Sequence, residues 1–442
     1  MASSGIEQAA NTGFKMLYMP LEGVEPLERY RPGGYHPVTI GDCLNTRYQI
    51  VHKLGFGTNS TTWLARDQKT ATYVAVKISV AQNEQPESDI LRLLNDEDSK
   101  QKRHIIPPLL DEFNLNGPNG EHKCVVTAPA RVSVAGAQDA SVNRLFQPSV
   151  ARAIAAQLIQ AVDFLHSLGI VHSGKLVLTL HCTTAANFFP DLHAGNILLC
   201  LPKSIDNLTV NQFYEKYRRP NPEPVERLDK KPLGNGVPTH GIMPVWLGED
   251  SEKITVPEAR ILLTDFGESF MPSTTKRYHS NTPALLRPPE LYFLPKEPVS
   301  FPADIWTLAC TIFSILGQRP LFEAFIPDDN WMIQEHVDTL GKLPPDWWSR
   351  WESRGKWFDE QGERRDGQLR RPWEERFEYS VQEPRRDCGM EGVSEQEKVA
   401  LIALLKPMMA YDPHERPTAK EILESEWMKK WALQDLGDMQ RK

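Results

Sequence analysis

Cysteine is scarce in this sequence, and its spacing suggests neither a metal site nor a disulfide framework. The 442 residues include six cysteines, which are scattered without a Cys-x-x-Cys pair and without histidines at matching intervals. Structural zinc sites and disulfide-rich domains require such patterns. We therefore exclude both classes and expect a reducing compartment, where proteins without disulfides are usual.

Long apolar runs and an excess of basic charge are also missing. The first 13 residues lack a basic stretch followed by an apolar one, and no segment approaches the roughly 18 apolar residues that would span a bilayer. The net charge of −8 argues against a binder of nucleic-acid phosphates and is compatible with basic partners. We expect a monomer of the cytoplasm and the nucleus that binds neither membranes nor nucleic acid directly.

The hydrophobic pattern changes along the chain. Hydrophobic residues make up 40% of the sequence, which is enough for two lobes with separate cores. Three early segments rich in β-branched and aromatic residues predict antiparallel strands: Tyr48–Lys53, Thr61–Arg66 and Thr72–Val80. Three later segments with apolar residues at helical intervals predict helices: Val150–Leu165, Ala303–Leu316 and Lys398–Met409.

These patterns predict an α+β fold in which a small β-rich lobe precedes a larger α-helical lobe. Residues 1–47 form an N-terminal extension rich in Gly and Pro, and residues 434–442 form a tail. The two lobes span residues 48–130 and 131–433, and the second lobe contains two inserts, at 201–259 and 327–395.

A glycine-rich segment lies between the first two predicted strands, where glycines let the backbone approach phosphate groups closely. The segment consists of Leu54, Gly55, Phe56, Gly57, Thr58, Asn59, Ser60, Thr61 and Thr62. An ordinary glycine-containing hairpin is the alternative for such a segment alone. About 20 residues further on, Val74-Ala75-Val76-Lys77 predicts a strand with one lysine that can neutralise phosphates, and Glu87 begins a helical pattern from which it can pair with Lys77. A solvated surface glutamate is the alternative for Glu87.

Two further motifs carry carboxylates and an amide. Residues 191–199 contain Asp191 and, five positions later, Asn196, which is the spacing of a catalytic base and a magnesium ligand. Residues 261–267 form an apolar strand that ends in Asp265-Phe266-Gly267, whose aspartate is the second metal ligand of the same pattern. Hard oxygen ligands such as these suit a magnesium ion held mainly by nucleotide phosphates.

In this order the motifs resemble those of the protein kinases. The resemblance implies a bilobal kinase fold that uses ATP and Mg²⁺, with Asp191 as the base, Lys77 and Glu87 positioning phosphates, and Asn196 and Asp265 as metal ligands. It further implies that Ala75 and Thr127 line the ATP site together with the glycine-rich segment.

Three structural positions agree with this resemblance. Arg287-Pro288-Pro289-Glu290 resembles the Ala-Pro-Glu motif that closes the activation segment, and Arg416 resembles the buried ion-pair partner of its glutamate. Asp304-Ile305-Trp306 resembles the start of the long central helix, whose aspartate supports the catalytic loop.

The N-terminal lead-in resembles one kinase family in particular, the kinases of SR-type splicing factors. Tyr30-Arg31-Pro32-Gly33-Gly34-Tyr35-His36-Pro37-Val38, followed by Gly41-Asp42, Arg47-Tyr48 and Lys53-Leu54-Gly55, matches the start of that family. Both inserts also fall where the family carries inserts, and the short first insert resembles compact fungal members. The family resemblance implies phosphorylation of serines in Arg/Ser-rich proteins. The first alternative is a pseudokinase scaffold that binds such partners without turnover.

Two residues depart from the kinase pattern. His193 stands where most serine/threonine kinases have a lysine two residues after the catalytic aspartate, and imidazole is only partly charged near neutral pH. We interpret His193 as a tolerated substitution. Ser173 stands where an arginine usually clamps an activation-segment phosphate, so we expect activity that does not depend on phosphorylation.

The second insert combines tryptophans with arginines and acids. We expect its aromatic cluster to serve packing, while an RNA-stacking surface, as in an RNA-associated interaction protein, is the other alternative. The cluster consists of Pro344, Pro345, Trp347, Trp348, Trp351 and Trp357. The family resemblance also implies acidic docking residues for arginine-rich substrates, for which Asp338 and Asp329 are the candidates. Because Trp331 stands in the place of another acidic docking residue of the family, we expect Arg/Ser peptides to bind weakly and in a salt-sensitive way.

The segment Gly174–Pro190 interrupts the catalytic loop. Removing it joins Ser173 directly to Asp191 and restores the tight His-x-Asp turn of working kinases. Its six large apolar residues would project from a site in which errors of about 1 Å matter. Its first codons can contain a splice donor, and those of Ala186-Asn187 can contain a branch point. The codons of Phe188-Phe189-Pro190 together with the first base of the Asp191 codon can give a pyrimidine tract ending in CAG. We interpret the segment as a translated intron, and a lineage-specific loop is the alternative.

Overall fold

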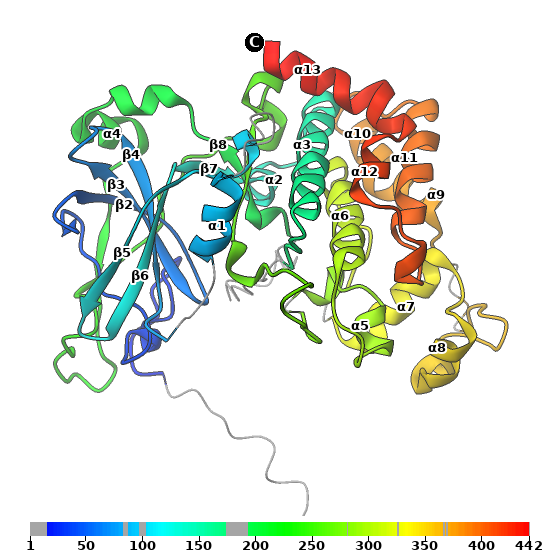
Figure 1. Ribbon diagram of the computed structural model, residues 1–442, viewed down its shortest axis with the longest axis horizontal. Helices are drawn as coiled ribbons and strands as arrows, with labels where there is room; N and C mark the ends of the chain where they lie inside the picture. Colours follow the sequence, from blue (N-terminus) through cyan, green and yellow to red (C-terminus); the bar gives the residue numbers. More distant parts are fainter. Residues whose placement is uncertain are drawn as a thin grey trace, which may run out of the picture. The chain divides into compact units, whose positions relative to one another are not determined.

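The computed structural model describes residues 16–82, 87–96, 103–173, 193–280, 282–324, 327–365, 367 and 370–441. These residues form two compact units. The first unit comprises Met1–Glu84, Leu110–Thr127 and Ser204–Val245, and the second comprises Gln85–Leu109, Ala128–Lys203 and Trp246–Lys442. Figure 1 draws their strands and helices.

A six-stranded sheet dominates the first unit, in the order β1-β2-β3-β4-β6-β5. Its strands are β1 (Cys43–Leu44), β2 (Tyr48–Gly57), β3 (Ser60–Asp67), β4 (Tyr73–Ser79), β5 (Leu109–Gly117) and β6 (Gly120–Thr127). β2, β3 and β4 confirm the three predicted strands. Alternate positions in them turn apolar side chains to one face, where Ile50, Trp63 and Val76 are each at most 1% exposed.

Two segments far apart in sequence cover this sheet. The N-terminal extension, with its short helix η1 (Leu27–Arg29), and the first insert share one apolar cluster that includes Tyr30, Tyr35 and Val225. The insert supplies α4 (Val210–Tyr217), which lies beside β3 and β4 in Figure 1, and the small strands β9 (Pro222–Pro224) and β10 (His240–Ile242). A capping box at Thr209 starts α4.

The second unit is mainly helical, as the sequence predicts. Its principal helices are α1 (Glu87–Asp96), α2 (Val134–Ala140), α3 (Pro148–Ser167), α5 (Glu290–Phe293), α6 (Phe301–Leu316), α7 (Asp329–Leu340), α8 (Pro345–Arg350), α9 (Trp373–Phe377), α10 (Glu383–Asp387), α11 (Glu395–Met408), α12 (Ala419–Leu423) and α13 (Leu433–Arg441). A three-stranded sheet runs in the order β11-β8-β7, with β7 (Ala130–Ser133), β8 (Ile197–Cys200) and β11 (Ile261–Leu263).

The buried helix α3 is the centre of this unit. It packs against α6, α12 and α13, and Figure 1 shows α13 across its end. The apolar residues that predict this helix are buried, Ile154 and Leu165 completely. None of the described helices is long and apolar enough to cross a membrane.

Candidate active site

The glycine-rich segment forms a tight hairpin between β2 and β3. Gly57 faces Ser60 across a two-residue turn, and Gly55 faces Thr62. A side-chain carbon at Gly55 would meet no atom within 4 Å, so the backbone there is open to an approaching group. Ser60, which is 8% exposed, occupies the position of the third glycine in the usual pattern.

The sheet register places the other predicted ATP-site residues of the first unit beside this hairpin. Lys77 on β4 pairs with Thr62 on β3, and Ala75 pairs with Thr127 on β6. Directly paired residues present their side chains on the same face of a sheet. Glu87 is the first residue of α1 in the second unit and is 7% exposed, and its pairing with Lys77 stays a prediction.

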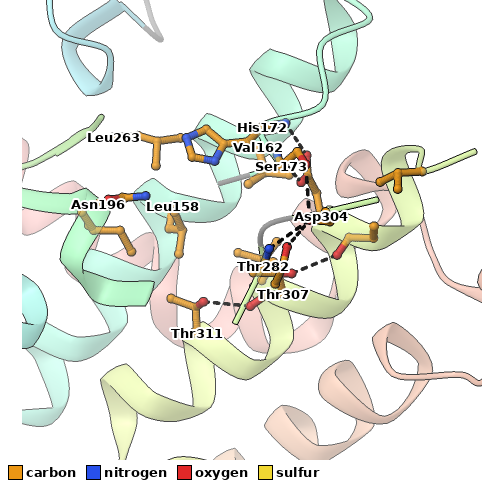
Figure 2. A pocket seen from close by; sticks show the side chains of 15 residues that line it. Leu158, Val162, His172, Ser173, Asn196, Leu263, Thr282, Asp304, Thr307 and Thr311 are labelled. Carbon is orange, nitrogen blue, oxygen red and sulfur yellow. Dashed lines mark hydrogen bonds between the residues drawn. The ribbon is translucent and has the colours of Figure 1, made fainter. Parts of the chain in front are cut away.

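The Asp304 carboxylate holds the start of the catalytic loop (Figure 2). It accepts hydrogen bonds from the backbone N–H groups of His172 (2.8 Å) and Ser173 (3.1 Å), and it lies 3.1 Å from His166 Nε2. Burial alone would raise the pKa of Asp304, but the hydrogen bond from His166 and the nearby histidines outweigh it, so its pKa lies below the ordinary range. The predicted support of the loop by Asp304 is thereby confirmed.

The predicted catalytic base lies outside the described residues. Asp191, Leu192 and the whole of Gly174–Pro190 belong to the undescribed part of the chain. The structure resumes at the backbone of His193, the first residue of the short helix η3 (His193–Asn196). The roles of Asp191 and His193 therefore stay predictions.

The two predicted metal ligands lie at the same end of the paired strands β8 and β11. Because Ile197 faces Leu263 in antiparallel register, Asn196 lies opposite Thr264, whose N–H donates to the Asn196 carbonyl at 2.9 Å. Asp265 follows directly, with its backbone in the left-handed region at φ 63°. Such strain costs about 1–3 kcal/mol in a non-glycine residue and is usual at functional sites.

The residue types, an amide and a carboxylate, fit a magnesium ion that takes its remaining ligands from nucleotide oxygens and water. No cluster of three or more His, Cys, Asp or Glu side chains that could bind a metal by itself occurs in the described ranges.

A pocket lies beside the catalytic loop (Figure 2). Its walls come from α3, α6, the loop and the activation segment, and its lining includes Ser173, Asn196 and Thr282. The hydroxyls of Ser280 and Thr282 are 2.5 Å apart. The pocket shows that the chain brings the segment after Asp265 back against the catalytic loop.

Two contacts fix the activation segment at its start. Val171 and Phe270 exchange backbone hydrogen bonds of 2.9 and 3.1 Å, and the ring of Phe266 packs edge-on against His172, 5.3 Å from its centre. Arg277 Nη1 donates to the Glu268 carbonyl at 2.7 Å and to its carboxylate at 3.2 Å. An internal ion pair thus occupies the segment in which other kinases use a phosphate.

The predicted buried ion pair closes the segment at its end. Arg416 donates to both carboxylate oxygens of Glu290, at 2.8 and 2.6 Å, and its side chain is 0% exposed. It also donates to the Pro302 carbonyl and lies over the Trp306 ring. This prediction is confirmed.

Removing that arginine should strongly destabilise the second unit. Arg416→Ala leaves the Glu290 charge without its partner, and breaking a buried pair costs about 3–5 kcal/mol. Denaturant unfolding is the measurement. The control is Arg386→Ala, which removes an exposed ion pair with Glu378 and should leave the free energy of unfolding almost unchanged. Equal effects of the two variants would contradict the structural role of the Glu290–Arg416 pair.

The first docking candidate, Asp338, is buried in the fold, and its docking role stays a prediction. Asp338 is 2% exposed, accepts a hydrogen bond from Gln334 at 3.0 Å and lies 3.6 Å from Arg364. Burial raises the pKa of its carboxyl against the opposing charge of Arg364. One of its carboxylate oxygens, Oδ2, is therefore engaged inside the fold. The Asp329 side chain is 66% exposed and lies 3.3 Å from Arg287, so it stays a candidate.

The aromatic cluster of the second insert serves packing, as predicted. Trp347, Trp348 and Trp351 are 6%, 4% and 3% exposed and form one core with Phe293 and Phe358. Buried rings offer no surface for stacking with nucleobases. Two arginines of this insert, Arg364 and Arg371, form ion pairs with Asp338 and Glu323. These contacts disfavour an RNA-binding insert.

Comparison with known proteins agrees with this geometry. Residues 252–428 match the protein kinase domain. A serine/threonine protein kinase of Aspergillus fumigatus is 24% identical, over 91% of this chain and 90% of its own. The serine/threonine-protein kinase SRPK of Physarum polycephalum is 26% identical over 91% of both chains. Human SRSF protein kinase 3 is 33% identical over 45% of this chain and 34% of its own.

The fold, the site and these similarities agree on one class: residues 252–428 match the protein kinase domain, and the chain is similar along most of its length to serine/threonine protein kinases, which are phosphotransferases that use ATP. Within that class it is similar to kinases of the SRPK-like group.

Proposed function

We propose that this protein transfers the terminal phosphoryl group of ATP to serine hydroxyls in Arg/Ser-rich proteins. The observation that carries the proposal is the placement of the glycine hairpin beside Lys77 in one unit and of Asn196 beside Asp265 in the other. Similarity to SRPK over 91% of the chain supports the choice of substrate. By analogy with that group we infer activity in both cytoplasm and nucleus.

Each residue has a separate task in this proposal. The hairpin backbone and Lys77, held by Glu87, bind and orient the phosphates. Asn196 and Asp265 hold Mg²⁺, which when bound neutralises charge that develops on the phosphoryl oxygens. Asp191 accepts the proton of the substrate hydroxyl. Catalysis then consists of positioning and electrostatic stabilisation, as is usual for phosphoryl transfer.

A peptide series tests the substrate class. We expect an Arg/Ser repeat peptide to have a higher kcat/KM than the same peptide with arginine replaced by alanine, and we expect the preference to fall as salt rises. Asp329 is the docking carboxylate that we propose first, since its side chain is 66% exposed whereas that of Asp338 is buried. Equal kcat/KM values for the two peptides would leave the kinase assignment intact and remove the Arg/Ser specificity.

The activation segment should function without phosphorylation. Ser173 supplies no cation for a phosphate, while Arg277 and Glu268 form an internal pair. Phosphatase treatment should therefore leave most activity, whereas Arg277→Ala should lower kcat/KM about tenfold, because a charged hydrogen bond contributes about 1.5–3 kcal/mol. The exposed neighbour Lys276 provides the control variant, Lys276→Ala. Loss of activity on dephosphorylation would refute this regulation.

A pseudokinase scaffold is the second candidate. The observation that favours it is the segment Gly174–Pro190, which separates His172 from Asp191 in sequence, together with His193 in the usual lysine position. A scaffold of this kind would bind Arg/Ser-rich partners and ATP but would transfer no phosphate. Assay of the chain with and without the segment separates the two candidates.

A further inference from the structure

The N-terminal extension contacts the glycine hairpin through a tyrosine. The hydroxyl of Tyr35 donates a hydrogen bond of 2.7 Å to the carbonyl of Gly57, the second glycine of the hairpin. Tyr35 is 1% exposed, so the donor of this bond is buried. A single side chain outside the sheet therefore holds the backbone at the hairpin tip, where glycines alone would leave it free to move.

A buried ionic cluster makes a second contact with the same hairpin. The ammonium of Lys53 pairs with one carboxylate oxygen of Glu25, and the hydroxyl of Tyr30 donates to the other. The side chains of Lys53 and Glu25 are 1% and 3% exposed. The Lys53 ammonium also lies 5.2 Å from the ring centre of Phe56, the residue between the two hairpin glycines. The extension is thus linked to both Phe56 and Gly57.

The extension itself is firmly held, so it can act as a support. Asn119, in the turn between β5 and β6, donates to the Tyr35 carbonyl at 2.7 Å and accepts from the Gly33 N–H at 2.8 Å. Gly34 admits no side chain, because a Cβ atom at this position would lie 1.9 Å from the Arg29 carbonyl oxygen. Tyr30 and Tyr35 also pack edge to face, with ring centres 5.5 Å apart. These contacts fix the place from which the Tyr35 hydroxyl reaches the hairpin.

We propose that Tyr35 is a positioning residue for nucleotide binding, which holds the glycine hairpin in the conformation that receives the phosphates. The inference rests on the proposed function, because it assumes that the hairpin covers ATP. A hairpin held in place before binding loses less conformational freedom when the nucleotide arrives, so affinity is higher. The extension is then part of the nucleotide site although none of its residues needs to touch ATP.

The test is Tyr35→Phe, which removes one hydroxyl and keeps the ring. Hydrogen exchange of residues 54–62 is measured in the free protein, and the Kd for ATP is measured by calorimetry. We expect faster exchange confined to these residues and an ATP affinity about 3- to 10-fold lower, the loss that corresponds to one hydrogen bond. In steady-state assays the KM for ATP should rise while kcat changes little.

The control is Tyr214→Phe. The hydroxyl of Tyr214 also donates to a β2 carbonyl, that of Val51 at 2.9 Å, but six residues before Gly57. It should leave both the exchange of residues 54–62 and the ATP affinity unchanged.

Unchanged exchange of residues 54–62 in Tyr35→Phe overturns the proposal, as does an equal change in both variants, which would mean only general loosening of the sheet. A wild-type protein that binds no ATP would instead refute the proposed function, and exchange in the free protein would still decide the role of Tyr35.

Discussion

Deleting Gly174–Pro190 should raise phosphoryl transfer at least about 100-fold over the full chain. Asp304 fixes His172 and Ser173 through their backbone N–H groups, so the position of the next residue is closely set. The deletion makes Asp191 that next residue. Displacing a catalytic group by about 1 Å can cost 100-fold, and 17 additional residues allow much larger displacements.

Two purified proteins, with and without the segment, are compared at equal concentration in a transfer assay. A deletion of equal length from the first insert would control for shortening of the chain. If the full chain transfers phosphate as fast as the deleted form, the segment is a natural loop. Genomic sequence without splice signals at the Gly174 and Asp191 codons would equally contradict the intron hypothesis.

Lys77→Met and Asp265→Ala should each lower kcat/KM at least about 100-fold while the protein stays folded. Lys77 is expected to act only through its charge beside the hairpin, and Asp265 through the metal that it is expected to hold. Removing one preorganised electrostatic contact to a transition state typically costs 100- to 1000-fold. Assays use the form without Gly174–Pro190, and circular dichroism checks the fold.

The matched control for the lysine variant is Lys123→Met, a half-buried lysine on the neighbouring strand β6. It should leave transfer nearly unchanged. Turnover in Lys77→Met equal to that of Lys123→Met would remove Lys77 from the site, and a fully active Asp265→Ala would remove the proposed metal ligand.

Local sequence patterns predicted much of this fold. Alternating β-branched residues predict β2, β3 and β4, and apolar residues at helical spacing predict α3. Both patterns arise because one face of each element is buried, which repeats every two residues in a strand and every 3.6 in a helix. The pairing of Asn196 with Asp265 followed from motif resemblance, and the structure adds that they adjoin two paired strands at the same end. The Glu290–Arg416 pair followed from motif resemblance alone.

Contacts between distant segments could not be predicted in the same way. Motif resemblance makes Asp338 a docking candidate, but its burial and its pairing with Arg364 arise only in the folded chain, and no local pattern indicates that partner. The link from Tyr35 to Gly57 depends on Asn119, which also binds the Gly236 carbonyl of the first insert at 2.7 Å. At Asn119 the N-terminal extension, the β5–β6 turn and the first insert meet, and tertiary packing sets their relative positions.

The most direct test of the central claim is transfer of labelled phosphate from ATP to an Arg/Ser peptide by the chain without Gly174–Pro190, measured beside the same chain carrying Asp191→Asn. We predict phosphoserine on the peptide with the first protein and a loss of at least about 100-fold with the second, because the substituted amide cannot accept the hydroxyl proton. ATP binding without any transfer by the first protein, or equal transfer by both, would contradict the assignment of this chain as an active kinase with Asp191 as its base.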